Sequence, residues 1–115
     1  MNYLVQMKLA SRPANPQEGK ALIEQMILPT LELCKKLEAE KKIVAGGPVG
    51  GSIALSVIVS AQSAEELDGL ITSLPVWPLM ETTVTPLATF EIRAQEVRLR
   101  LEQMKQQAKA QAGAQ

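Results

Sequence analysis

The segment from Ser52 to Ala61 constrains the fold more than any other part of this sequence. Its residues alternate between two sets, an entirely aliphatic one (Ile53, Leu55, Val57, Val59) and a smaller, partly polar one (Ala54, Ser56, Ile58, Ser60). A period of two is typical of a β-strand, whose successive side chains point to opposite faces of a sheet. The segment therefore predicts a strand that is covered on both faces, by a different structure on each.

Three further segments predict strands. Residues 2–10 alternate in the same way, with Tyr3, Val5, Met7 and Leu9 on one side. The apolar run 43–45 is followed by the turn formers of residues 46–51, which predict a hairpin into the strand at 52–61. Residues 81–90 are rich in β-branched side chains, and Pro86 among them indicates an edge or bulge position.

Two capping signals mark the starts of helices between these strands. Asn15, Pro16 and Glu18 predict a helix from Gln17 to about Lys42. Pro29 removes one backbone hydrogen bond from it, so we expect a kink near residues 25–29 or two short helices. Residues 63–66, Ser-Ala-Glu-Glu, open a second helix that must end before Pro75.

The order of these elements is β, α, β, β, α, β over residues 1–90, which is typical of an α+β, ferredoxin-like domain with a four-stranded antiparallel sheet. A length of 115 residues fits one such domain. Residues 91–115 have a different composition and predict an added amphipathic helix, with Val97, Leu101, Met104 and Ala108 on its apolar side. We expect the helix to pack on a neighbouring subunit and its end, residues 108–115, to fray.

Composition excludes several classes of function. The chain has no histidine and one cysteine, so the usual zinc sites and imidazole catalysis are not expected, and we expect no metal. Lys plus Arg and Asp plus Glu number 12 each, and this balance predicts no nucleic-acid partner. The absence of a long apolar run and of a signal-peptide pattern predicts a cytoplasmic protein without a membrane partner.

A local signature resembles the muconolactone delta-isomerase family. It comprises residues 63–66, the turn Leu-Pro-Val-Trp-Pro-Leu-Met at 74–80, and the strand that begins at Glu81. The resemblance implies subunits whose sheets pack into a dimeric α/β barrel, a homo-oligomer that is a dimer or a higher ring, and an isomerase of aromatic catabolism that works without a cofactor. The sequence departs from the family pattern at Leu79, in the glycine cluster 46–51 and in the added C-terminal helix.

The reaction of that family moves a proton between two carbons of an unsaturated lactone, so it needs a base, an acid and a group that stabilises an enolate. We expect Gln6, Lys8 and Ser56 to share the more polar face of the sheet, with Tyr3 or Trp77 closing one end. Lys8 is the candidate for the substrate carboxylate, and Glu24 or Glu32 for the base. The alternative is that these charges lie in solvent and that Trp77 is a packing residue.

Two other functions remain open at this point. The same fold can serve as a non-catalytic, oligomeric protein that binds a small apolar molecule or acts as a scaffold, which fits the scarcity of acid and base candidates. A cofactor-free monooxygenase is suggested by analogy of fold, and three aromatic residues speak against it. Cys34 has no basic neighbour on its helix face and is interpreted as a packing residue.

Overall fold

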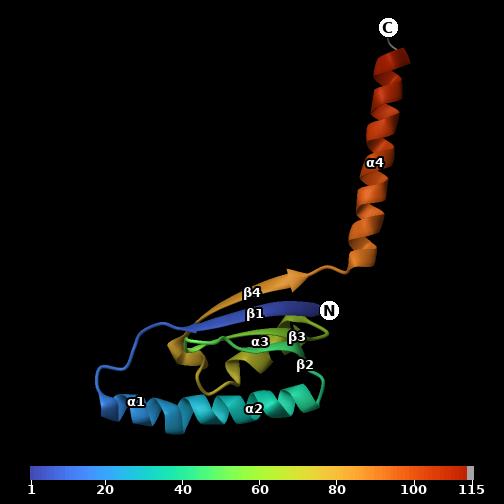
Figure 1. The fold of residues 1–115 in the computed structure, drawn as a ribbon. Helices are drawn as coiled ribbons and strands as arrows, with labels where there is room; N and C mark the ends of the chain where they lie inside the picture. Colours follow the sequence, from blue (N-terminus) through green and yellow to red (C-terminus); the bar gives the residue numbers. More distant parts are fainter. Residues whose placement is uncertain (114–115) are drawn as a thin grey trace.

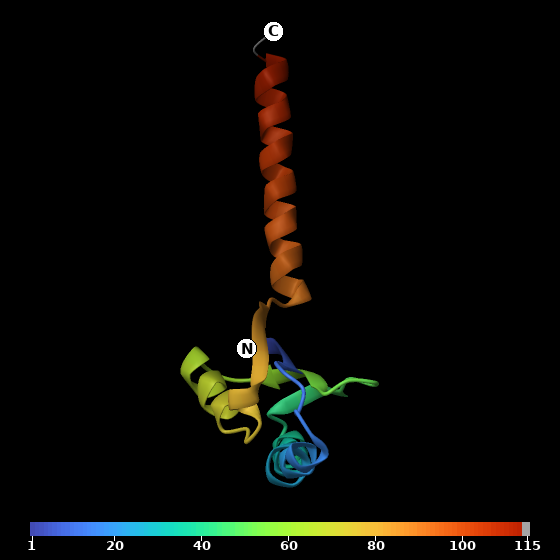
Figure 2. The ribbon, with the colours of Figure 1, turned by 90° about the vertical axis from the view of Figure 1, so that its left-hand side faces the viewer.

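The computed structural model describes residues 1–113 and shows a four-stranded antiparallel sheet, one face of which is covered by helices (Figure 1, Figure 2). The strand order is β2-β3-β1-β4. The strands are β1 (Asn2–Leu9), β2 (Ile43–Pro48), β3 (Ala54–Ser60) and β4 (Met80–Leu87). This confirms the predicted α+β, ferredoxin-like arrangement, and β4 with Pro86 is an edge strand as expected.

The helices are α1 (Pro16–Leu22), α2 (Leu28–Ala39), α3 (Ala64–Thr72) and α4 (Phe90–Gly113). Both predicted caps form. The Asn15 side chain accepts a hydrogen bond from the Glu18 amide at 2.9 Å, and the Ser63 hydroxyl accepts one from the Glu66 amide at 3.1 Å. These caps fix where α1 and α3 begin, because each satisfies a backbone donor that the first turn leaves unpaired.

An irregularity was expected near Pro29. The structure has a π-helical turn just before it, over Ile23–Ile27, and this turn joins α1 to α2. The Leu28 amide donates to the Ile23 carbonyl, five residues back in place of four. Pro29 then lies in the first turn of α2, where a missing N–H costs least. The wider turn lets α1 and α2 follow one another along one line (Figure 1).

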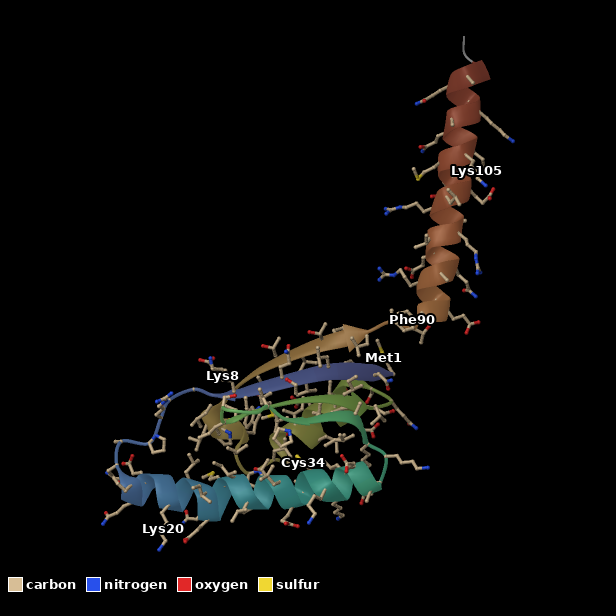
Figure 3. All side chains as sticks on the ribbon, in the orientation of Figure 1. Met1, Lys8, Lys20, Cys34, Phe90 and Lys105 are labelled. Atoms are coloured by element: carbon tan, nitrogen blue, oxygen red, sulfur yellow. The ribbon has the colours of Figure 1, made fainter. Side chains whose placement is uncertain are left out.

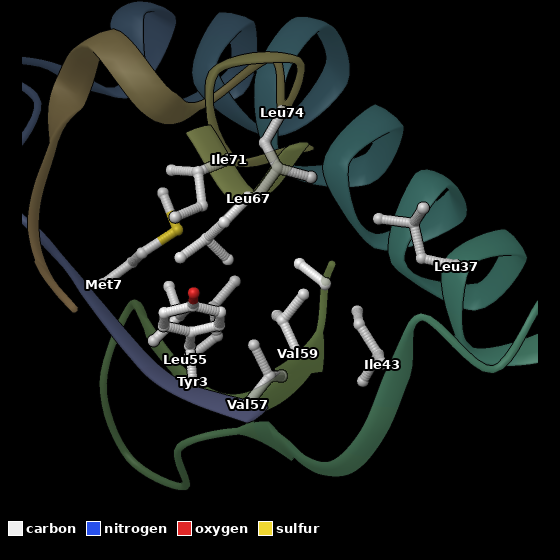
Figure 4. Close-up of a cluster of buried hydrophobic side chains, with 12 residues drawn as sticks. Tyr3, Met7, Leu37, Ile43, Leu55, Val57, Val59, Leu67, Ile71 and Leu74 are labelled. Carbon is white, nitrogen blue, oxygen red and sulfur yellow. The ribbon is translucent and has the colours of Figure 1, made fainter. Parts of the chain in front are cut away.

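The core lies between the sheet and the helices. Alternate residues of β1 and β3 point into it, and the Val5 and Met7 side chains are 1% exposed. Leu55, Val57 and Val59 of the predicted aliphatic set are buried, whereas Ile53 precedes β3 and is exposed. The helices and the segments that follow them contribute further apolar side chains (Figure 4): Leu37, Ile43, Leu67, Ile71 and Leu74.

The glycine cluster forms the predicted hairpin, but two of its glycines lie inside β2 and not in the turn. Gly46 has a φ of 96°, and a Cβ atom there would collide with the Ser56 carbonyl oxygen. The pairing register of β2 shifts between Ile43 and Ala45, just before this glycine. A β-bulge with a left-handed glycine explains the cluster here better than a long flexible loop.

Helix α4 projects away from the domain and makes few contacts with it (Figure 1, Figure 2). The Thr89 hydroxyl accepts a hydrogen bond from the Ile92 amide at 3.1 Å and caps its first turn. The helix runs to Gly113, and residues 114–115 of the segment expected to fray lie outside the described residues. Among residues 1–113, no helix combines the length and the apolarity that crossing a membrane requires.

Candidate functional site

The face of the sheet that turns away from the helices carries a row of polar side chains. Gln6 in β1 is paired with Ser56 in β3 and with Thr83 in β4. Residues paired in this way point to the same face of an antiparallel sheet, with Cβ atoms about 4.5–5.5 Å apart. The fold therefore brings Gln6 and Ser56 together, and it adds Thr83 from a strand distant in sequence.

The next register position of the same face carries two opposite charges. Lys8 in β1 is paired with Glu81 in β4, and both side chains are exposed. Figure 3 shows Lys8 on the side of the sheet away from α1 and α2. Within residues 1–113, neither side chain forms an ion pair with another residue. An ammonium group and a carboxylate thus stand beside the polar row, each available to a ligand.

The two halves of this open face differ in the size of their side chains. The β2–β3 half carries almost only small residues, and the β1–β4 half carries longer ones. The open-face residues of the β2–β3 half are Ala45, Gly47, Ala54, Ser56, Ser60 and one larger residue, Ile58, and those of the β1–β4 half are Asn2, Leu4, Gln6, Lys8, Glu81, Thr83, Thr85 and Leu87. Two copies of such a face, turned by a twofold rotation, would set long side chains against short ones.

Tyr3 and Trp77 lie apart from the polar row. Tyr3 shares the parity of Val5 and Met7, so its ring is buried on the helical face, and its hydroxyl donates to the Met1 Sδ at 3.4 Å. Trp77 lies in a 3₁₀ turn, Trp77–Leu79, between α3 and β4, with 39% of its surface exposed. The structure therefore places Tyr3 in the core and Trp77 on the surface before β4.

Glu24 and Glu32 point into solvent from the helix layer. Glu24 forms an ion pair with Lys20 at 3.8 Å, and Glu32 forms one with Lys35 at 3.2 Å. Their side chains are 58% and 69% exposed, respectively. The fold does not bring either glutamate to Lys8, because the helices cover the opposite face of the sheet. The acid that does stand beside Lys8 is Glu81, which no local sequence signal identified, since strand register is set by long-range pairing.

A hollow lies on the helical side, between α2 and the β2–β3 hairpin. Its volume is about 240 Å³, its walls are mainly apolar, and Lys35 and Glu38 stand at it as the charged groups. A neighbouring hollow of about 160 Å³ shares Leu31, Pro48 and Leu55 with it. Cys34 lines the larger hollow, and burial raises the pKa of its thiol.

Acidic and sulfur side chains do not gather into a metal site in the part of the chain that the structure describes. The open sheet face is built from amide, hydroxyl, ammonium and carboxylate groups, and the hollow beside α2 has mainly apolar walls. Such groups suit proton transfer or simple binding of a small organic molecule.

The sequence model of the muconolactone delta-isomerase family matches residues 1–92. The chain belongs to this family. The matched region spans all four strands and ends in the first turn of α4, so most of that helix lies beyond the family's common part. The resemblance seen in the turn before Glu81 is thereby confirmed for the whole ferredoxin-like domain.

Solved structures of this family's fold agree. The crystal structure of a muconolactone isomerase has 23% sequence identity and a TM-score of 0.65, over 77% of this chain and 90% of that chain. A 5-chloro-2-hydroxyhydroquinone dehydrochlorinase from Burkholderia phenoliruptrix, in complex with 2,5-dihydroxybenzoquinone, has 21% identity and a TM-score of 0.59. This match covers 79% of this chain and 97% of the dehydrochlorinase chain. No curated protein sequence matches the chain.

Proposed function

We propose that this member of the muconolactone delta-isomerase family is a cofactor-free isomerase that moves a double bond in a small, carboxylate-bearing lactone. The observation that carries the proposal is the register of the open sheet face. It sets Lys8 beside Glu81 and Gln6 beside Ser56 and Thr83. These side chains supply a cation, a carboxylate and three hydrogen-bonding groups in two adjacent rows.

Each group has a role in the proton shift. The Glu81 carboxylate removes a proton from a carbon conjugated with the lactone carbonyl, the electron pair moves toward the carbonyl oxygen, and the same carboxyl returns the proton to another carbon. Lys8 binds the substrate carboxylate. Gln6, Ser56 and Thr83 offer donors to the developing enolate oxygen, whose stabilisation is usually the largest part of such catalysis.

Glu81 takes the role of base in preference to Glu24 and Glu32. Those two carboxylates lie in solvent on the outer side of the helices and already pair with Lys20 and Lys35. A substrate held by Lys8 stands on the other side of the sheet. Tyr3 is likewise directed into the core, so it supports the sheet from behind and does not touch the substrate.

A second copy of the chain completes the site. In one copy the polar row is open to water, which weakens every electrostatic contact it makes. Face-to-face packing of two sheets, as in a dimeric α/β barrel, excludes that water, and the long and short halves of the face complement each other across a twofold axis. The proposal therefore includes a homodimer, or a higher ring built from it, in the cytoplasm.

The chemistry named by the two similar structures supports this choice of substrate class. One is a muconolactone isomerase, and the other is a dehydrochlorinase bound to a dihydroxybenzoquinone. Isomerisation of a lactone and loss of HCl both require removal of a proton, and both act on small oxygenated rings. A breakdown product of an aromatic compound is thus the substrate to test first.

The test is conversion of muconolactone by the purified full-length chain, followed by ultraviolet absorbance. We expect Glu81→Gln to lower kcat by about 10²–10⁴-fold. We expect Lys8→Met to act mainly by raising KM, because it removes a charge that binds the substrate before and during the reaction. Glu24→Gln and Glu32→Gln are the matched controls and should leave both constants unchanged. Parent-like turnover by Glu81→Gln would refute the assignment.

The hollow beside α2 favours a second function, that of a non-catalytic protein that binds a small molecule. Its walls are mainly apolar, and Leu31 and Cys34 line it. If this is the function, the chain binds a small ring compound saturably without converting it, and Leu31→Trp abolishes binding by filling the space. Isothermal titration with muconolactone, alongside the absorbance assay, separates the two functions, since the isomerase binds and also turns over.

A further inference from the structure

Helix α4 carries a continuous seam of apolar residues that the domain does not use. The seam consists of Phe90, Ala94, Val97, Leu101, Met104 and Ala108, spaced alternately by four and three residues. This spacing is the heptad pattern of coiled coils, in which each side chain of the seam inserts into a hole formed by four residues of the facing helix. The pattern indicates that the missing partner is a helix.

The seam is uncovered in the single chain. Phe90 is 97% exposed, and Val97, Leu101 and Met104 are 56%, 49% and 59% exposed. Figures 1 and 2 show the helix standing clear of the sheet from both directions. A helix with no tertiary contacts is marginally stable in water, so a partner that covers the seam would stabilise it as well.

We propose that α4 pairs with α4 of a second copy in an antiparallel coiled coil, centred between Val97 and Leu101. In this register Phe90 meets Ala108 of the partner, and Ala94 meets Met104 of the partner. The outer layers of the interface then combine a large side chain with alanine, and the central layers combine Val97 with Leu101 of the partner. Such alternation fills the interface at the density that helix packing requires.

A parallel pair would pack less well, because each residue of the seam would meet its own copy. Ala94 would face Ala94 and leave a gap, while Phe90 would face Phe90. The flanking residues disagree with a parallel pair too. It would place Arg93 beside the partner's Arg98 and Arg100 beside the partner's Lys105, which are like charges on both sides of the seam.

The antiparallel pair lowers the number of like-charge contacts from four to two and adds two contacts of opposite charge. Glu91 stands beside Lys105 of the partner, and by symmetry this contact occurs twice. Arg98 and Arg100 each meet their own copy near the twofold axis. Glu102 and Glu96 lie one turn away from them on the same helix, but in the single chain they form ion pairs with Lys105 and Arg93. The balance of charges therefore favours the antiparallel direction over the parallel one, and the matching of large with small side chains favours a second copy as the partner.

Disulfide cross-linking of the full-length chain tests the register. In a Cys34→Ala background, chains with Ala94→Cys and chains with Met104→Cys are produced separately and also coexpressed. We expect the coexpressed chains to form a mixed disulfide on mild oxidation, and each variant alone to stay largely monomeric on a non-reducing gel. Only the antiparallel register brings these two positions within the roughly 6–7 Å between Cα atoms that a disulfide allows.

A matched pair of substitutions shows whether the seam is responsible. Leu101→Lys lies on the seam and should abolish the mixed disulfide, whereas Leu99→Lys lies on the opposite face of α4 and should leave it intact. Self-cross-linking of Ala94→Cys, absence of the mixed disulfide, or its persistence in Leu101→Lys would each overturn the proposal. None of these outcomes depends on isomerase activity.

A membrane is the other surface that the exposed apolar and cationic side chains of a helix can contact. The parent chain is therefore sedimented with phosphatidylglycerol vesicles. We expect it to stay in the supernatant. Pelleting with the vesicles that Leu101→Lys prevents and Leu99→Lys does not would assign the seam to lipid and overturn the coiled coil.

Discussion

The two faces of the sheet are built from alternate residues of the same strands, yet they differ in kind. On the helical face Val5 and Met7 are almost completely buried among aliphatic side chains. On the other face their neighbours Gln6 and Lys8 are exposed and stand beside polar groups of β3 and β4. The residues that stabilise the fold therefore lie on one face, and the candidate functional residues lie on the other. Neighbouring residues of β1 belong to opposite faces.

The largest effect that separates the faces is expected at Met7. Met7→Ala removes a side chain that is 1% exposed and leaves a cavity under α3, so it should lower the free energy of unfolding by about 2–5 kcal/mol. Gln6→Ala, one residue away on the open face, should change it by less than about 0.5 kcal/mol. Urea unfolding of both variants at one protein concentration measures the difference. Equal losses would show that the open face also carries stability.

The next effect concerns the edge where β2 joins the sheet. Gly46 has a left-handed backbone, and a Cβ atom there would also lie 2.7 Å from the Val57 Cα. Gly46→Ala should therefore cost about 1–3 kcal/mol. At Gly47, which faces Ser56, an added Cβ meets nothing within 4 Å, so Gly47→Ala should be nearly neutral for unfolding. Thermal unfolding of the pair tests this, and a neutral Gly46→Ala would contradict the bulge.

The elements of this fold could be predicted from sequence because their signals are local. The caps at Asn15 and Ser63, the alternation in β1 and β3, and Pro86 in an edge strand are each contained within a few residues. The position of Tyr3 also follows from the alternation in β1, because Tyr3 has the same parity as the core residues Val5 and Met7. The expectation that Tyr3 closes the polar face does not agree with this alternation.

The candidate site was harder to predict because it depends on long-range pairing. The neighbour of Lys8 is Glu81, and only the register of β4 against β1 reveals it. The positions of Glu24 and Glu32 depend on the π-helical turn at Ile23–Ile27, which changes the phase of the helix by an amount that Pro29 alone does not specify. The polar row of Gln6 and Ser56 was predictable, whereas its acid was not.

A smaller effect is expected where α3 is held over the helical face. The Ser63 hydroxyl caps α3 by accepting from the Glu66 amide, so Ser63→Ala should cost about 1 kcal/mol of unfolding free energy. Ser60→Ala, at the open-face end of β3, removes a hydroxyl without a capping role and should cost less. Denaturant midpoints at a constant slope measure both. A larger loss in Ser60→Ala would argue that the open face is held by polar contacts.

The smallest expected effect is a pH dependence of the unfolding free energy that arises from Cys34. Cys34 lies on the helical side, and burial raises the pKa of its thiol above the ordinary value of 9.0. The folded chain then holds this proton more tightly than the unfolded chain does. The stability that follows is fully present below about pH 9 and is lost as the pH rises through the folded value.

Cys34→Ala should therefore lose less stability than the parent as the pH rises from 8 through the folded pKa of the thiol, whereas the two should fall in parallel if the thiol were freely hydrated. The rate of thiol modification gives an independent reading of the same burial. At pH 8 the folded parent should react more slowly than the chain unfolded in urea, because it holds less thiolate, the reactive form. Equal rates would mean that the hollow beside α2 is open to water, and that this side of the sheet is less dry than the core around Met7.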